Sequence, residues 1–185
     1  ALFQLGVRRL TVDSLAMAEL LGSVLKSLPG SSCIDLAIRI HDGNSHFGFP
    51  AEKEILERAV REIPASAIRS LGLHIHSNPP GSARSLLDLT ADFRQRCQRL
   101  KPVIQALGSK LSFLDLGGGI DSPYVYRPSP AELGRFHNPA EAHELRTAVS
   151  PDRFSLWEAG AEIGQVVLQE LGQEWSNRRV LFEPG

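Results

Sequence analysis

Cysteine is scarce in this chain: Cys33 and Cys97 are the only two among 185 residues. Small secreted scaffolds that depend on disulfides carry many more, and zinc-binding modules place their cysteines in close pairs. Neither cysteine here stands beside another Cys or a His. We therefore expect reduced thiols, a cytoplasmic protein and no metal site.

An excess of charge of one sign is also missing. The 20 Lys and Arg residues balance 21 Asp and Glu residues, which leaves a formal net charge of −1 at pH 7. Nucleic-acid-binding proteins usually carry a basic patch or run, and no such run occurs here. No apolar run is long enough to span a bilayer. We therefore expect that the protein binds neither nucleic acid nor a membrane.

The two ends of the sequence resemble internal positions of a longer protein. Residues 1–3 contain neither an initiator Met nor the pattern of a signal peptide, and the chain stops at Gly185, directly after a Glu-Pro pair. The length suits one sizeable core better than two independent domains. We expect residues 1–185 to be the later part of one domain.

Short apolar segments alternate with longer segments of helical periodicity. The predicted strands are residues 7–13, 34–40, 70–76, 111–116 and 179–183. The predicted helices are residues 17–28, 51–63, 85–107 and 156–171. This alternation is typical of βαβ units with a parallel sheet. Residues 121–153 interrupt it and are rich in Pro, Tyr, His and Arg, which predicts an inserted loop with one short helix near residues 140–147.

Each predicted strand has one apolar face, because alternate side chains point to opposite sides of a strand. The other face ends in a polar residue at the carboxyl end of the strand, and these residues are Asp13, Arg39, His76, Asp115 and Glu183. An active site at the carboxyl-terminal mouth of a (β/α)8 barrel has this form, whereas the strands of an open doubly wound sheet are usually apolar on both faces. The pattern favours a TIM-type barrel, and a partial one, because five strands cannot close the usual eight.

Three glycines, Gly117, Gly118 and Gly119, directly follow the fourth predicted strand in "LSFLDLGGGIDSP". Glycine lets the main chain approach a phosphate closely, so this turn can bind a phosphate group through its N–H groups. A tight turn without a ligand is the structural alternative. A methyltransferase-like loop is another, but it requires a following helix and then a strand that ends in an acidic residue, and a Pro-rich insertion follows instead.

Two histidines, His74 and His76, share one face of the third predicted strand in "GLHIHSNPPGS". A zinc site would need further ligands, which the sequence does not place nearby. His76 ends the strand, where a functional role is favoured, and His74 lies one layer deeper, where a structural role is favoured.

Three other residues at or just after strand ends are notable. Arg39 is either an inward functional cation or one half of a core ion pair. Ser14 follows the first strand and is favoured as a helix N-cap. Glu183 ends the last strand in "LFEPG", where its carboxylate could serve a cationic ring nitrogen.

Six motifs occur in the order found in the fold-type III pyridoxal-phosphate decarboxylases. They are "GVRRLTVDS", "LAIRI", "SHFGF", "GLHIH", "LDLGGGI" and "LFEPG". The chain resembles this family, which includes the diaminopimelate and ornithine decarboxylases and shares the barrel of alanine racemase, over nearly its whole length outside residues 121–153. The resemblance implies that the chain covers barrel strands four to eight.

The resemblance also implies roles for individual residues. His76 matches the histidine that stacks on the pyridine ring, and Glu183 matches the carboxylate that pairs with the ring nitrogen and keeps it protonated. The glycines at 117–119 match the turn that binds the cofactor phosphate, and Gly185 belongs to the same phosphate site. Arg39 matches a family arginine near the ring. The expected cofactor is therefore pyridoxal 5'-phosphate, and the catalytic residues are His76 and Glu183.

Some family features are not in this sequence. The lysine that carries the cofactor lies on the first barrel strand, and Lys26, Lys53, Lys101 and Lys110 lie in helix or loop patterns. The C-terminal β-domain and the arginine after Glu-Pro-Gly are absent too. The family usually has a Gly-Ser pair directly after the stacking histidine, whereas here residues 77–80 (Ser-Asn-Pro-Pro) come before Gly81 and Ser82. Whether Ser77 or Ser82 contacts the phosphate is left open.

The resemblance predicts an amino-acid carboxy-lyase. We expect a homodimeric enzyme in amino-acid metabolism that acts on a basic amino acid of the diaminopimelate or ornithine type. Racemisation on the same barrel is one alternative, and a non-catalytic barrel that binds a partner is another.

Overall fold

The computed structural model describes residues 6–28, 33–41, 46–76, 86–118 and 156–182. The inserted segment predicted at 121–153 lies outside these ranges. Strands and helices alternate: β1 (Arg9–Val12), α1 (Leu15–Ser27), β2 (Ile34–Ile40), α2 (Lys53–Arg61), β3 (Ile68–Ile75), α3 (Leu86–Leu107), β4 (Leu111–Asp115), α6 (Leu156–Leu171) and β5 (Arg179–Leu181). Short 3-10 turns, η1 (Ala65–Ala67), η2 (Gly108–Lys110) and η3 (Gln173–Trp175), precede β3, β4 and β5. The predicted alternation is confirmed, with shorter first and last strands.

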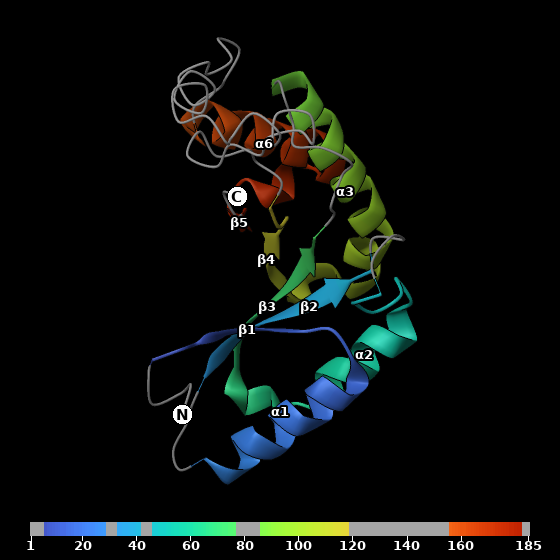
Figure 1. Ribbon diagram of the computed structural model, residues 1–185, viewed down its shortest axis with the longest axis vertical. Coiled ribbons are helices and arrows are strands. Elements are labelled where there is room, and N and C mark those ends of the chain that lie inside the picture. Colours follow the sequence, from blue (N-terminus) through green and yellow to red (C-terminus); the bar gives the residue numbers. More distant parts are fainter. Residues whose placement is uncertain (1–5, 29–32, 42–45, 77–85, 119–155, 183–185) are drawn as a thin grey trace, which may run out of the picture.

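The five strands form one parallel sheet in which the spatial order β1-β2-β3-β4-β5 equals the chain order. Crossovers between parallel strands are almost always right-handed, so an order without reversal places successive helices on the same face. Figure 1 shows α1, α2, α3 and α6 along the outside of a curved row of strands. The predicted parallel α/β architecture is confirmed, and closure of a barrel stays a prediction.

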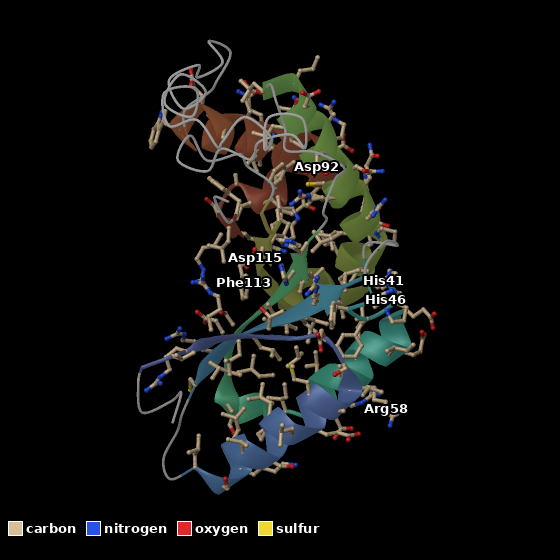
Figure 2. The ribbon with its side chains drawn as sticks, in the orientation of Figure 1. His41, His46, Arg58, Asp92, Phe113 and Asp115 are labelled. Atoms are coloured by element: carbon tan, nitrogen blue, oxygen red, sulfur yellow. The ribbon has the colours of Figure 1, made fainter. Side chains whose placement is uncertain are left out.

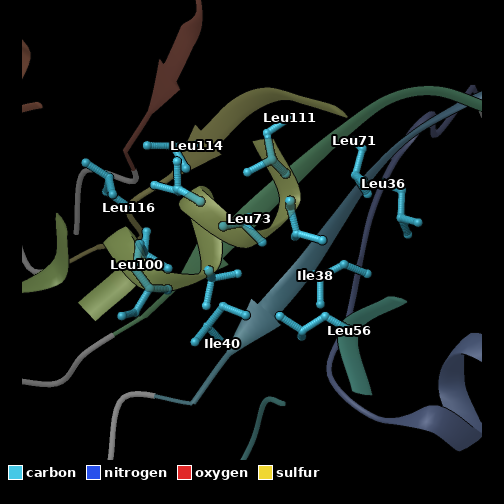
Figure 3. Packing of buried hydrophobic residues seen from close by; sticks show 14 of the residues in the cluster. Leu36, Ile38, Ile40, Leu56, Leu71, Leu73, Leu100, Leu111, Leu114 and Leu116 are labelled. Carbon is cyan, nitrogen blue, oxygen red and sulfur yellow. The ribbon is translucent and has the colours of Figure 1, made fainter. Parts of the chain in front are cut away.

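One hydrophobic core lies between this sheet and the helices. On the side of the sheet that faces the helices, Leu36 and Ile38 of β2 and Leu73 of β3 have no exposed surface. Leu56 of α2 and Leu100 of α3 pack against them, as Figure 3 shows. Burying such a side chain stabilises the fold by about 1.5–3 kcal/mol, so the helix-facing side of the sheet is the main source of stability.

Helix α1 begins at a capped residue. The hydroxyl of Ser14 accepts a hydrogen bond from the N–H of Met17 at 3.3 Å, which confirms the predicted N-cap. Leu21 and Leu25 are buried against the core, but Leu20 is 66% exposed. The apolar residues of this helix are therefore divided between the core and the surface, and only some of them face the sheet.

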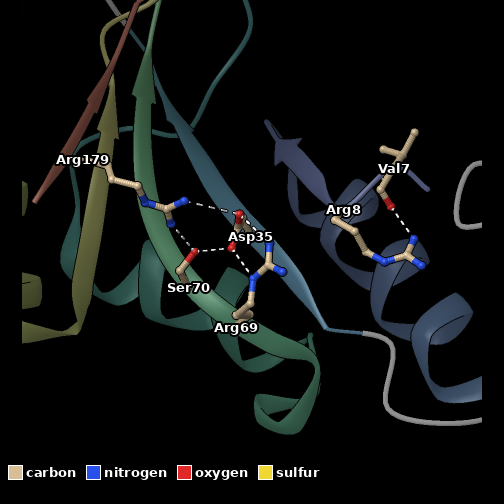
Figure 4. A network of polar contacts seen from close by, with 6 residues as sticks. All are labelled: Val7, Arg8, Asp35, Arg69, Ser70 and Arg179. Atoms are coloured by element: carbon tan, nitrogen blue, oxygen red, sulfur yellow. Dashed lines mark hydrogen bonds and ion pairs between the residues drawn. The ribbon is translucent and has the colours of Figure 1, made fainter.

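The opposite face of the sheet is polar at its amino end. Asp35 of β2 accepts hydrogen bonds from Arg69 at 2.8 and 3.0 Å and from the Ser70 hydroxyl. Arg179 of β5 donates to Ser70 at 3.1 Å and lies 3.8 Å from the Asp35 carboxylate (Figure 4). The hydrogen bonds from Arg69 lower the pKa of Asp35 to about 2, with burial acting in the other direction. This network joins β2, β3 and β5 across the face of the sheet that points away from the helices, which we call the inner face.

A single aromatic ring fills the next layer of that face. Phe113 of β4 has no exposed surface, and a Cβ built on Gly72 would lie 2.4 Å from its ring. Arg9 and Arg179 place their guanidinium groups 5.7 and 5.5 Å from the ring centre. Gly72 therefore provides the space into which Phe113 packs.

Among the described helices, none combines the length and the apolar content that crossing a membrane requires.

Candidate functional site

The carboxyl ends of the central strands bring three charged or titratable side chains into one layer. Arg39 of β2 is in register with His74 of β3, and His74 is in register with Asp115 of β4. Alternation along each strand places all three on the face opposite the helices. His76 and Gly117 lie two residues further along their strands, at the edge of the sheet. The predicted gathering of polar residues at this edge is thus present for β2, β3 and β4.

A turn at Gly117 directs the chain over the end of β3. Gly117 has a φ of +67°, a conformation that side chains rarely adopt. A Cβ at this position would lie 2.7 Å from the carbonyl oxygen of Ile75 and 3.1 Å from Nδ1 of His76. Only glycine permits this approach, so the turn and His76 form one packed unit.

The amide groups of this turn face the inner side of the sheet. The N–H of Gly117 donates to Oδ1 of Asp115 at 3.0 Å, and the N–H of Gly118 donates to Nδ1 of His76 in a long hydrogen bond of 3.5 Å. An anion placed at this edge could compete for the N–H of Gly118, because the contact that it now makes is weak.

The rings of His74 and His76 meet edge to face and are not stacked in parallel. The rings of His74 and His76 lie 6.2 Å apart at an interplanar angle of 61°. His74 is buried and His76 is half-buried. This agrees with a deeper position for His74 and leaves His76 accessible from the carboxyl edge. In the described part of the chain, no group of three His, Cys, Asp or Glu side chains is arranged to hold a metal ion.

Arg39 extends along the same edge from β2. Its guanidinium carbon lies 5.5 Å from the centre of the Phe47 ring. Its Nε is buried and has no hydrogen-bond partner among the described residues. A buried donor without a partner is costly, so this nitrogen suits an acceptor supplied by a ligand.

Sequence reasoning missed Arg96 of α3, which is 1% exposed. Its Nη1 donates to the carbonyl oxygens of Leu116 and Gly118, the latter at 2.7 Å, and its Nη2 pairs with Asp92. Figure 2 shows Asp92 on α3 and Asp115 at the end of β4. The signal in the sequence is an arginine in the buried stripe formed by Phe93, Arg96, Cys97 and Leu100. A charged residue at a core position requires partners there.

Several predicted site residues lie outside the described residues. These are Gly119, Glu183 and Gly185, together with Ser77 and Ser82. Asp13, predicted at the same rim, lies half-buried after β1. The structure thus brings His76, Gly117, Gly118 and Arg39 to one edge of the sheet, and the roles of all the predicted residues stay predictions.

Comparison with known proteins gives one curated relative and several similar structures. The chain is 27% identical to a diaminopimelate decarboxylase from Actinosynnema pretiosum subsp. auranticum, over 90% of this chain and 39% of the relative. The chain therefore spans about two fifths of the relative that it matches. No family model matches the sequence.

The similar structures share the fold at low sequence identity. A diaminopimelate decarboxylase from M. jannaschii in complex with L-lysine has a TM-score of 0.59 at 16% identity, over 99% of this chain and 39% of that chain. A lysine decarboxylase from Selenomonas ruminantium has a TM-score of 0.55 at 20% identity, over 100% of this chain and 40% of that chain. SrLDC in complex with pyridoxal phosphate (PLP) and cadaverine has a TM-score of 0.50 at 19% identity, over 100% of this chain and 38% of that chain. The resemblance of this chain to the fold-type III pyridoxal-phosphate decarboxylases, predicted from its motifs, is therefore confirmed.

Proposed function

We propose that this chain is the later part of the cofactor-binding barrel of a pyridoxal-phosphate-dependent amino-acid decarboxylase. The observation that carries the proposal is the Gly117 turn, which packs against His76 at the carboxyl edge of a parallel sheet. Sequence similarity to a diaminopimelate decarboxylase over 90% of the chain supports the same function. In the complete protein these strands are barrel strands four to eight, and residues 121–153 are an insertion.

The described residues fit the two ends of the cofactor. The close approach at Gly117 and the weakly held N–H of Gly118 suit a phosphate ester, since small residues and amide groups bind such anions. The half-buried imidazole of His76 suits a flat ring packed against it. The buried Nε of Arg39, which has no hydrogen-bond partner within the described ranges, suits an acceptor on a ligand at the same edge.

The remaining roles follow from the family resemblance. Gly119 and Gly185 extend the phosphate site, and the carboxylate of Glu183 accepts a hydrogen bond from the pyridine N–H and keeps that nitrogen protonated. When bound, pyridoxal phosphate supplies a ring that accepts the electrons left at the α-carbon as CO2 departs. His76 and Glu183 orient that ring and set its charge.

The whole protein supplies what this chain lacks. We propose that it contains the cofactor lysine and a β-domain, and that it is a cytoplasmic homodimer without a nucleic-acid or membrane partner. The substrate is a basic amino acid, because the similar structures are lysine and diaminopimelate decarboxylases.

Decarboxylation by the purified full-length protein tests the proposal. With pyridoxal phosphate added, CO2 release is measured from lysine, ornithine and meso-diaminopimelate. We expect turnover of at least one substrate and a large loss in His76→Ala and Glu183→Ala, each made separately. Wild-type turnover in both variants would contradict the site assignment.

Two other results would favour the alternative functions, a racemase or a non-catalytic barrel. Loss of optical activity without CO2 release identifies a racemase. Failure of the protein to take up pyridoxal phosphate, judged by its absorbance spectrum, favours a non-catalytic barrel.

A further inference from the structure

Arg96 and the inner-face residues hold opposite sides of the turn at residues 116–118. The carbonyl oxygens of Leu116 and Gly118 point toward α3, where both accept from Nη1 of Arg96. The N–H groups of Gly117 and Gly118 point the other way, toward Asp115 and His76. In this turn the carbonyl groups of Leu116 and Gly118 therefore lie on the helix side, and the N–H groups of Gly117 and Gly118 lie on the side of the candidate site.

The orientation of Arg96 is itself fixed. Asp92, one turn earlier on α3, pairs with Nη2, and the guanidinium carbon lies 4.5 Å from the centre of the Phe93 ring. Arg96 is 1% exposed, so water does not compete for its hydrogen bonds. Because Asp92 compensates its charge, Arg96 acts on the turn through the direction of its hydrogen bonds more than through a net positive field.

We propose that Arg96 is a positioning residue. It turns the carbonyl groups of Leu116 and Gly118 away from the site and holds the turn in the conformation in which the weakly bound N–H of Gly118 faces the phosphate of the cofactor. This inference rests on the proposed function for the identity of the anion. The orientation of these carbonyl and N–H groups is a property of the structure and does not depend on that function. Asp92 supports this role because its carboxylate pairs with Nη2 and holds the Arg96 guanidinium group in place.

Two variants and a control separate positioning from general stability. Arg96→Lys keeps the charge but cannot reproduce the planar fork of donors, and Asp92→Asn keeps the volume but weakens the hold on Arg96. Arg94→Lys is the matched control, because Arg94 lies on the same helix and is ion-paired with Glu170 at 3.1 Å on the surface.

Affinity for pyridoxal phosphate and for pyridoxal, which lacks the phosphate, is measured by absorbance titration of each full-length variant. We expect Arg96→Lys to weaken binding of pyridoxal phosphate by about tenfold and binding of pyridoxal by no more than about threefold. Asp92→Asn should have a smaller effect of the same kind, and Arg94→Lys none. Equal losses for both ligands would overturn the proposal, because they would show a merely structural role.

Amide hydrogen exchange without cofactor gives a second, independent measure. Exchange at Gly117 and Gly118 should be faster in Arg96→Lys than in the wild type and in Arg94→Lys. If the wild type takes up no pyridoxal phosphate, the proposed function fails. The exchange rates at Gly117 and Gly118 are then the test of whether Arg96 positions the turn. Unchanged exchange at both glycines would then overturn the positioning role.

Discussion

Among the described carboxyl groups, Asp35 has a pKa that folding clearly lowers. Its pKa is lowered from 3.8 to about 2 by the hydrogen bonds from Arg69, and it is 3% exposed. A depressed pKa in the folded state stabilises the protein above the unfolded pKa, and this contribution is lost as the pH falls from about 4 to about 2. Since Arg69 and Arg179 are half exposed, we expect a contribution on the order of 1–2 kcal/mol.

Denaturant unfolding between pH 2 and pH 6 measures this effect. The Asp35→Asn variant should be less stable than the wild type at pH 6, and its free energy of unfolding should fall less steeply toward pH 2. Glu19→Gln, which removes an exposed carboxyl on α1, gives the baseline for losing one negative charge. A slope in Asp35→Asn as steep as in the wild type would contradict the assigned role.

The two cysteines differ in reactivity for a physical reason. Burial, and to a lesser degree the carboxylate of Glu170, raises the pKa of the Cys97 thiol to about 12. The thiolate is the reactive form, so Cys97 should resist iodoacetamide at pH 8. Cys33 is half-buried and should react first. Peptide mass mapping of the folded and the denatured protein checks this, and rapid labelling of Cys97 in the folded state would contradict the packing of α3.

At the scale of elements, the pairing of β3 with β4 depends on Gly72 and Phe113. A Cβ at Gly72 would lie 2.4 Å from the ring of Phe113, which has no exposed surface. We expect Gly72→Ala to destabilise the protein by about 1–3 kcal/mol through overpacking. The free energy of unfolding of the single variants and of Gly72→Ala with Phe113→Leu measures it.

The double variant is the decisive one in this series. A smaller side chain at residue 113 leaves room for the added methyl group, so the two changes should cost less together than the sum of their separate costs. Strict additivity would mean that the ring does not limit the space at residue 72.

At the scale of the whole molecule, binding of the cofactor should stabilise the fold. A ligand that binds only the folded state at a concentration 100 times its dissociation constant stabilises by about 2.7 kcal/mol. We expect pyridoxal phosphate to raise the melting temperature of the full-length protein, and His76→Ala to reduce that rise. Arg58→Ala, an exposed change on α2 away from Asp115 at the end of β4 (Figure 2), is the control. A rise in His76→Ala equal to that of the wild type would contradict a contact between His76 and the ring.

The sequence by itself determined the order of the elements and the two faces of the sheet. Strict alternation in residues such as Leu36, Ile38 and Ile40 is a local property of extended chain, so it could be read without the fold. The cap at Ser14 is also local, because it depends on the N–H of Met17 three residues later.

Only the tertiary structure decided which distant groups meet. Arg96 donates a hydrogen bond to the carbonyl oxygen of Gly118. Asp35 accepts a hydrogen bond from Arg69 and lies within ion-pair distance of Arg179. Phe113 occupies the space that the missing side chain of Gly72 leaves. Each contact joins elements far apart in the chain, and the register that brings them together shifts at Ile34/Asp35 and at Leu71/Gly72. A shift of one residue moves every later side chain relative to its neighbour strand, and sequence periodicity does not contain that information.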